Sequence, residues 1–174
     1  MRGNRARSTI ILSLTAATLL TISHGTNANA VSSSSSTNPT AIVAQFHDGS
    51  GLAVVLRQGE YNGAGKGWGW AKIVGKHGIT NMNLVKMIIG LPGAGTADPQ
   101  DPDRIVYRAV AERGVCSNGG CRATEIVNTV AVVDYGPAGW DSSHVFGVVT
   151  AYCDFGDPAK WLCPPWVNNI KVVM

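Results

Sequence analysis

The spacing of hydrophobic residues changes from a helical to a strand-like period near the middle of the chain. Between residues 80 and 91 the apolar side chains recur three and four positions apart, which is typical of a helix with one buried face. The segments 104–114, 123–136 and 144–153 are instead rich in Val, Ile, Thr and Tyr and are separated by turn-forming residues. They predict three consecutive antiparallel strands, a β-meander.

The segments before residue 80 predict a hairpin and a shorter helix. The β-prone runs 41–46 and 52–58 surround the sequence His-Asp-Gly-Ser-Gly, which suits a hairpin turn. Residues 61–70 contain so much glycine that we expect a loop there. Residues 71–78 then predict one or two helical turns that end at Gly78.

The order of these elements predicts an α+β fold. Thr80 or Asn81 is expected to cap the second helix, and residues 90–103, with three prolines and three glycines, are expected to form a loop after it. A short N-terminal hairpin and helices would then pack on a C-terminal antiparallel β-meander. Residues 164 and 165 are prolines, so we expect only a short regular segment at the C terminus.

The N-terminal 30 residues have the three regions of a secretory signal peptide. Three arginines precede a short apolar stretch, and Ala-Asn-Ala provides the small residues for cleavage after Ala30. The apolar stretch is shorter than the roughly 20 residues that a membrane anchor needs. Residues 31–40 include five consecutive serines and predict a disordered linker. We therefore expect residues 41–174 to form a single secreted domain without a membrane span.

Cleavage of this leader changes the charge of the protein. The leader holds three of the 14 basic residues, which leaves 11 basic against 11 acidic residues. The whole molecule then has no net attraction for nucleic acid or for an anionic membrane. A local excess of cations remains in residues 57–86, where Glu60 is the one acid. That excess suits either an anion site or solvated lysines around a helix.

The four cysteines predict two local disulfides in an exported protein. Cys116 and Cys121 enclose Ser-Asn-Gly-Gly, which suits a tight turn, and a Cys153–Cys163 bond would connect the last long strand to the C-terminal segment. Zinc binding is the alternative, but neither spacing is Cys-x-x-Cys and no histidine is nearby in the sequence. We predict no metal or other cofactor.

His77 is the strongest candidate for proton transfer. It follows Lys72 and Lys76 at the end of the shorter predicted helix. An imidazole can donate and accept a proton near neutral pH, and a nearby ammonium lowers its pKa or binds a substrate anion. The same three residues also suit an ordinary helix C terminus, where cations favour the helix dipole.

Two strands add further candidates. Arg108 lies in the middle of the first long strand, on the face shared by Val106, Val110 and Glu112, and would suit a phosphate group. Exposed strands with cross-strand salt bridges are the alternative. In the last strand Thr150 and Tyr152 alternate to one side and present two hydroxyls, although such β-prone residues also simply fill strands.

Tryptophan is abundant for a chain of this length. Trp68 and Trp70 flank a glycine in the basic loop and could stack on a nucleobase or a sugar. Packing against a small core is the alternative. The sequence contains neither the G-x-S-x-G motif of hydrolases nor the H-E-x-x-H motif of metalloproteases.

Three segments in order carry a resemblance to a known group of proteins. "GWGWAKIVGKHG", "RIVYRAVAER" and "TVAVVDYG…VFGVVTAYC" resemble the layout of toxin ribonuclease domains of the barnase–EndoU–colicin–RelE-like group. The same outline is similar to small secreted actinobacterial proteins of unassigned role. The resemblance covers residues 65–153 through short motifs.

The resemblance implies a metal-independent ribonuclease that cleaves RNA by attack of the 2′-hydroxyl. His77 matches the final histidine of the helical motif, Lys76 its preceding lysine, and Lys72 stands where the group has a first histidine. The cationic residue that the group carries on a strand would be Arg108, and the hydroxyl residues of its last strand would be Thr150 and Tyr152. RNA and a cognate immunity protein would be the partners. The hypothesis from another class is a non-catalytic, disulfide-stabilised module that binds a surface glycan or protein through its Trp-rich loops.

Overall fold

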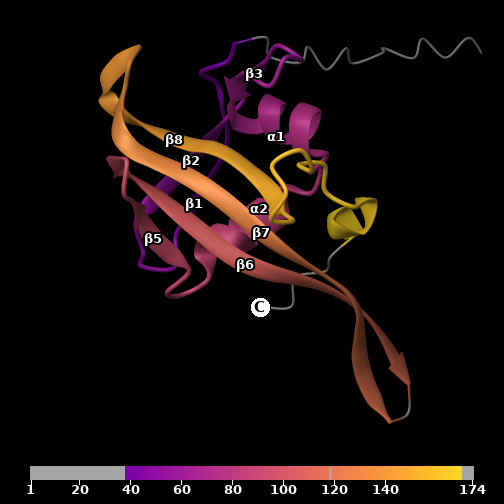
Figure 1. The fold of residues 1–174 in the computed structure, drawn as a ribbon. Coiled ribbons are helices and arrows are strands. Elements are labelled where there is room, and N and C mark those ends of the chain that lie inside the picture. Colours follow the sequence, from indigo (N-terminus) through magenta and orange to yellow (C-terminus); the bar gives the residue numbers. More distant parts are fainter. Residues whose placement is uncertain (1–37, 118, 170–174) are drawn as a thin grey trace, which may run out of the picture. The chain divides into compact units, whose positions relative to one another are not determined.

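The computed structural model describes residues 38–117 and 119–169; the predicted signal peptide and most of the serine-rich linker lie outside the described residues. Its main feature is a four-stranded antiparallel sheet in the order β5-β6-β7-β8 (Figure 1). The bounds are Gly95–Asp98 (β5), Asp101–Ser117 (β6), Gly120–Ala138 (β7) and Asp141–Asp154 (β8). The predicted meander is confirmed, and its strands run further into the turns than their β-prone cores.

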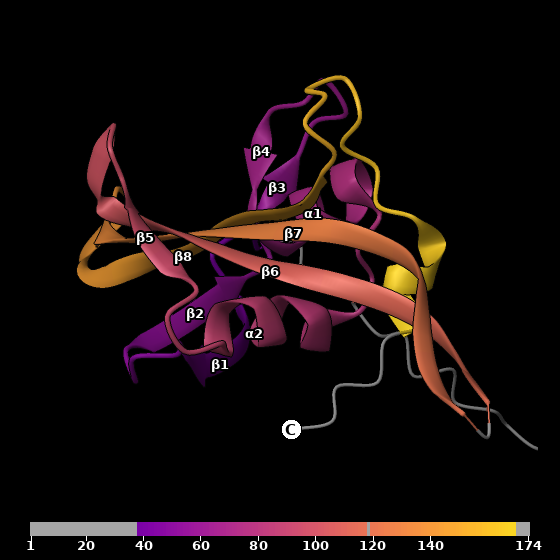
Figure 2. The same ribbon diagram turned by 60° about the horizontal axis from the view of Figure 1, so that its bottom comes forward.

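Helices and hairpins lie on both sides of this sheet. Their bounds are Ile42–His47 (β1), Ala53–Arg57 (β2), Glu60–Tyr61 (β3), Gly67–Trp68 (β4), Gly69–His77 (α1) and Met82–Gly90 (α2). Figure 2 shows α2 with β1 and β2 on one side and α1 with β3 and β4 on the other. The helix α2 packs against β6 and β7, whereas α1 and β2 pack against β8, the strand at the edge of the sheet. The α+β prediction is confirmed.

The core follows from the alternation along β6 and from the stripe on α2. Tyr107, Ala109 and Ala111 are buried, while the side chains between them are exposed. The apolar stripe of α2 is fully buried: Leu84, Val85, Ile88 and Ile89. The Asn81 side chain caps α2 by accepting a hydrogen bond from the backbone N–H of Asn83, as predicted.

Two segments that we predicted as loops contain strands. Residues 61–70 include part of the short β3–β4 ladder, and α1 already begins at Gly69. The segment 90–103 contains β5, which pairs with β6 alone. An edge strand tolerates neighbouring prolines because only one of its sides needs backbone donors. Gly95 of β5 also lies so close to Tyr107 that a larger residue would not fit.

Both predicted disulfides are present. Cys116–Cys121 closes the tip of the β6–β7 ribbon, which extends away from the helices in Figure 1. Cys153–Cys163 joins the end of β8 to the segment before a short 3-10 helix, η1 (Pro165–Asn169). This pairing indicates an oxidising or extracellular compartment. The predicted short regular segment at the C terminus corresponds to η1.

A buried carboxylate connects the β1–β2 turn to the sheet. Asp48 accepts hydrogen bonds from the hydroxyls of Tyr107, at 2.7 Å, and Tyr135, at 3.1 Å. It also accepts hydrogen bonds from the hydroxyl and N–H of Ser50 and from the N–H of Leu52. Burial raises the pKa of Asp48, but the hydrogen bonds from Tyr107, Ser50 and Leu52 hold it well below its usual range. The turn is therefore fixed on the sheet by an ionised and fully bonded side chain.

Candidate functional site

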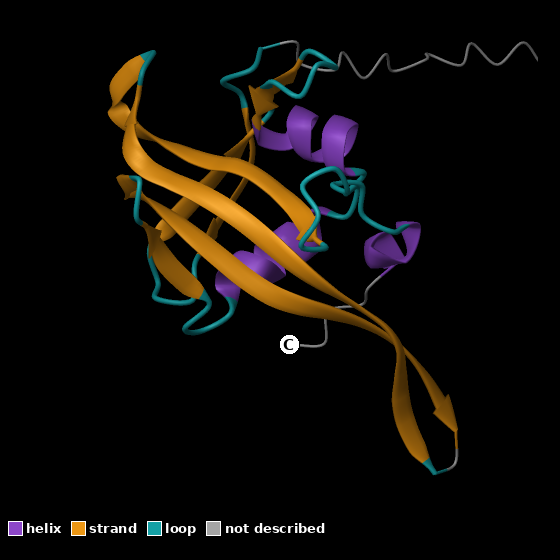
Figure 3. Cartoon of the chain, viewed as in Figure 1, coloured by secondary structure: helices purple, strands orange, loops and turns teal. Residues whose placement is uncertain are grey.

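A cavity of about 430 Å³ lies between α1, the end of β8 and the loop that follows β8. Figure 3 shows this loop beside α1. The cavity is lined by Lys72, Lys76 and His77 of α1, by Thr150, Tyr152, Cys153 and Asp154 of β8, and by Gly156, Asp157, Pro158, Lys160 and Trp161 of the loop. Five residues singled out from the sequence thus surround one space: Lys72, Lys76, His77, Thr150 and Tyr152.

His77 is the last residue of α1 and is 4% exposed. Its Nδ1 lies 3.1 Å from the backbone carbonyl oxygen of Trp161. Because a carbonyl only accepts hydrogen bonds, Nδ1 carries the ring proton and Nε2 keeps a free lone pair. Gly78 ends the helix directly after His77 in the left-handed conformation, as predicted, with a φ of 69°.

Two buried polar atoms in the cavity wall have no hydrogen-bond partner among the described residues. They are Nε2 of His77 and Oγ1 of Thr150. Most buried polar groups in proteins are paired, because an unpaired one costs about 1–3 kcal/mol. A pair of unsatisfied atoms in one cavity therefore points to a site that a ligand completes.

The surroundings of His77 keep its ring neutral. Burial lowers the pKa of His77 to about 4; the hydrogen bond to Trp161 opposes this shift, and the ammonium groups of Lys76 and Lys72 add to it. Burial and then the charge of Lys76 lower the pKa of Lys72 from its ordinary 10.5. The cavity thus holds a neutral imidazole beside an ammonium that loses its proton more easily than usual.

Tyr152 lies over the histidine. The two ring centroids are 5.6 Å apart. Burial raises the pKa of Tyr152, Asp154 raises it further, and Arg108 opposes both effects. The hydroxyl therefore stays protonated at neutral pH.

Both cations and acids line the cavity. The ammonium of Lys76 lies 5.1 Å from the ring centroid of Trp161, and Lys160 lies 3.9 Å from a carboxylate oxygen of Asp157. With Lys72 and Asp154, the lining contains three ammonium groups and two carboxylates. A single anionic group therefore fits the charge of the cavity.

Arg108 lies next to the cavity rather than in its wall. The strand register pairs Arg108 with Val130 and Val130 with Tyr152, so Arg108 and Tyr152 share one face of the sheet. Arg108 lines an adjoining hollow of about 280 Å³, and Asp154 borders both spaces. Its guanidinium donates to the Thr96 hydroxyl at 3.3 Å.

The two predicted substrate-binding tryptophans lie elsewhere. Trp68 stacks on Trp140, at 5.0 Å between ring centroids, and contacts Phe146 at 4.8 Å. Trp70 packs against the core. The exposed aromatic side chain beside the cavity is Trp161 instead. Sequence reasoning missed Trp161 because its contact with His77 is made by a backbone carbonyl, which no side-chain pattern reveals.

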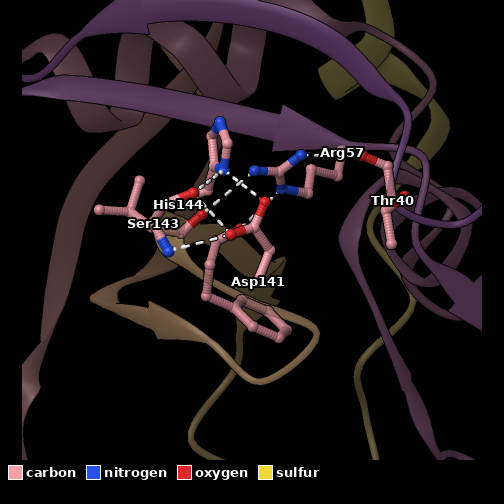
Figure 4. Close-up of polar contacts among 7 residues, drawn as sticks. Thr40, Arg57, Asp141, Ser143 and His144 are labelled. Atoms are coloured by element: carbon pink, nitrogen blue, oxygen red, sulfur yellow. Dashed lines mark hydrogen bonds and ion pairs between the residues drawn. The ribbon is translucent and has the colours of Figure 1, made fainter.

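A second group of polar residues lies at the start of β8. His144 Nδ1 is 2.7 Å from an Asp141 carboxylate oxygen and 2.9 Å from the Ser143 hydroxyl (Figure 4). In a hydrolase triad the serine and the acid contact opposite nitrogens of the imidazole, whereas here both contact Nδ1. This exposed group is therefore not a catalytic triad. Beside it, Arg57 connects β2 to β8 by donating to the carbonyls of Val145 and Phe146.

Comparisons of the chain with protein-family models, with curated proteins and with solved structures find no match. Within residues 38–117 and 119–169, no group of three or more His, Cys, Asp or Glu side chains could hold a metal ion. The same residues include no helix of sufficient length and hydrophobicity to cross a membrane.

Proposed function

We propose that this protein is an exported, toxin-like endoribonuclease that cleaves RNA in the cavity between α1 and β8. The observation that carries the proposal is the neutral His77, whose Nε2 lone pair lacks a partner beside the ammonium of Lys72. Such a pair supplies a base and an acid in one anion-sized space. The two disulfides support folding in an oxidising compartment, and the predicted signal peptide, cleaved after Ala30, would direct export.

The reaction is a transesterification within the RNA. Nε2 of His77 accepts the proton of the 2′-hydroxyl, and the 2′-oxygen forms a bond to the adjacent phosphorus. The bond from phosphorus to the 5′-oxygen breaks, and the Lys72 ammonium gives its proton to that oxygen. The products are a 2′,3′-cyclic phosphate and a 5′-hydroxyl. Water then returns a proton from the imidazolium to Lys72.

The other lining groups stabilise the transition state and bind the chain. Lys76 and the hydroxyls of Thr150 and Tyr152 would donate to the phosphate oxygens as negative charge develops. Because Nε2 of His77 is buried, a neighbouring side chain would move when RNA enters, and the adjacent Tyr152 ring is the group that we expect to move. Arg108 would contact the neighbouring stretch of RNA, since it lines the adjoining hollow.

The test is incubation of RNA with the oxidised mature protein in EDTA, beside His77→Ala. We expect cleavage that releases cyclic phosphates and a loss of about 100- to 10,000-fold in His77→Ala. His144→Ala is the matched control, because this exposed histidine lies near the start of β8 and does not line the cavity. Intact RNA with wild-type protein, or equal activity of His77→Ala, rules out the proposal.

The pH profile distinguishes this site from an ordinary histidine. A base must be unprotonated, so cleavage should fall as the pH drops through about 4, the pKa of His77. The alkaline limb should lie below pH 10.5, because the pKa of Lys72 is lowered. An acidic limb near pH 6.5 would contradict the assignment of His77 as the base.

A second candidate is a binding module without catalysis. Phe155, Trp161 and Leu162 are exposed on the loop after β8, and such a cluster suits an aromatic contact with a sugar or a protein. Retention of RNA or a glycan by the protein without any cleavage, abolished by Trp161→Ala, would favour this candidate over the nuclease.

A further inference from the structure

The loop between Cys153 and Cys163 does more than line the cavity, because it also holds His77. The Trp161 carbonyl accepts from Nδ1 of the ring, and the Cys163 N–H donates to the His77 carbonyl at 2.9 Å. Two backbone groups of one loop thus bond to both the side chain and the main chain of a single residue. The loop therefore controls where the ring lies and which nitrogen carries its proton.

The disulfide closes the neck of an otherwise exposed loop. Residues 154–162 are all exposed, whereas Cys153 and Cys163 are 1% and 4% exposed. The backbone hydrogen bond within the loop is local, from the Lys160 N–H to the Asp157 carbonyl. With a Cα–Cα distance of 5.2 Å, the disulfide is the covalent link that holds the two ends of the loop together.

A separate contact anchors the chain after the loop. The Asn168 side chain accepts from the Thr80 N–H at 2.7 Å and donates to the Gly78 carbonyl at 2.9 Å. This contact fixes η1 on the α1–α2 turn without involving either cysteine. Loss of the disulfide should therefore loosen the loop while η1 and the rest of the domain remain in place.

We propose that the Cys153–Cys163 disulfide positions His77, so that the active site is complete only when this disulfide has formed. By closing the loop it holds the Trp161 carbonyl on Nδ1 of His77 and leaves the lone pair on Nε2. This inference rests on the proposed function. A chain that folds with both thiols reduced has an incomplete site, and the nuclease becomes active where a disulfide oxidant accepts two electrons and two protons from the thiols.

The burial of Cys153 and Cys163 determines when their disulfide can be formed or reduced. Because both cysteines are almost inaccessible to solvent, a dithiol reductant reaches the bond in the folded protein only slowly. The state of the site is thus set in the compartment where the chain folds. A nuclease of this kind stays inactive in the reducing cytosol that makes it.

The test compares two double variants, Cys153→Ala/Cys163→Ala and Cys116→Ala/Cys121→Ala. Each removes one disulfide, but the second pair lies at the exposed ribbon tip. The ¹⁵N chemical shifts of the His77 ring report the tautomer, and RNA cleavage reports the activity. We expect mixed tautomers and about 100-fold slower cleavage in the first variant, since small misplacements of a catalytic group have effects of this size. The second variant should match the wild type, because distant sites act independently.

A loop insertion keeps the test valid if the first variant does not fold. Two glycines placed between Gly156 and Asp157 lengthen the loop and leave both cysteines in place, and they should produce the same changes. Either readout unchanged in the folded first variant or in the insertion variant overturns the inference. If the wild type cleaves no RNA, the proposed function fails by itself, and the ring shifts still decide whether the disulfide positions His77.

Discussion

Asp48 and His77 are both buried and ionisable, yet their surroundings differ completely. Asp48 receives hydrogen bonds from two tyrosines and from the residues of its own turn. His77 has one ring nitrogen bonded to a carbonyl, while the other has no partner among the described residues. Asp48 borders a small hollow of about 130 Å³, and His77 lines the cavity of about 430 Å³.

The difference separates a polar group that stabilises the fold from one available to a ligand. A fully bonded carboxylate regains inside the protein the interactions that it lost from water. A buried nitrogen without a partner costs stability, and a bound ligand that donates a hydrogen bond to it would remove that cost. The two centres should therefore respond in opposite ways to substitution: stability should depend on Asp48, and activity on His77.

Replacement of the histidine by an apolar residue should give the largest effect. His77→Leu removes the proposed base, so RNA cleavage should fall by about 1,000-fold. The free energy of unfolding should change by less than about 1 kcal/mol, because the substitution also removes an unsatisfied buried nitrogen. Urea unfolding and cleavage assays on the same preparation check both. A loss of several kcal/mol would mean that His77 serves the fold instead.

Replacement of the carboxylate should give the opposite pattern. Asp48→Asn keeps the shape but turns one acceptor into a donor that faces a tyrosine hydroxyl or a backbone N–H, which should lower the free energy of unfolding by about 3 kcal/mol. Cleavage at a temperature where the variant is folded should stay close to wild type. Glu112→Gln is the control, since this exposed carboxylate should matter by less than about 0.5 kcal/mol.

Lowering the pH should reduce the free energy of unfolding through His77 and through Asp48 in two separate pH ranges. The pKa of His77 is about 4 in the folded state and 6.5 when unfolded, so the unfolded chain binds more protons and stability falls as the pH drops from 6.5 to 4. The pKa of folded Asp48 lies below its ordinary 3.8, so its contribution is complete above pH 3.8 and is lost below it. His77→Leu should flatten the first window alone, and Asp48→Asn the second alone. Urea unfolding from pH 7 to well below pH 3 measures both.

Local signals explain which parts of the fold were predictable. The strands of the meander, the cap at Asn81, the end of α1 at Gly78 and the two disulfides each depend on residues close together in the sequence. The strand β5 was missed because its Gly- and Pro-rich sequence resembles a loop, and only pairing with β6 makes it a strand. Tertiary contact there outweighs local propensity.

The site was predictable only where side-chain periodicity applies. Lys72 and Lys76 are one helical turn apart, and Thr150 and Tyr152 alternate along a strand, so their shared faces can be deduced. The Asp48 centre could not be deduced in this way, because Tyr107 and Tyr135 lie 59 and 87 residues away in sequence. The carbonyl of Trp161 and the exclusion of Arg108 from the cavity likewise depend on how the elements pack.

The smallest effect is expected at two threonines of the same sheet, of which one is hydrogen-bonded like Asp48 and the other, like Nε2 of His77, lacks a partner within the described part of the chain. The Thr129 hydroxyl donates to the Ala109 carbonyl at 3.0 Å, whereas the Thr150 hydroxyl has no partner among the described residues. Both side chains are buried, and valine has the same shape. Thr129→Val should therefore lower the free energy of unfolding by about 1 kcal/mol, and Thr150→Val should leave it unchanged or raise it by about as much. If the Thr150 hydroxyl contacts phosphate, Thr150→Val should also slow RNA cleavage while Thr129→Val does not. Equal losses of stability in the two variants would show that the Thr150 hydroxyl is satisfied within the folded protein and is not available to a ligand.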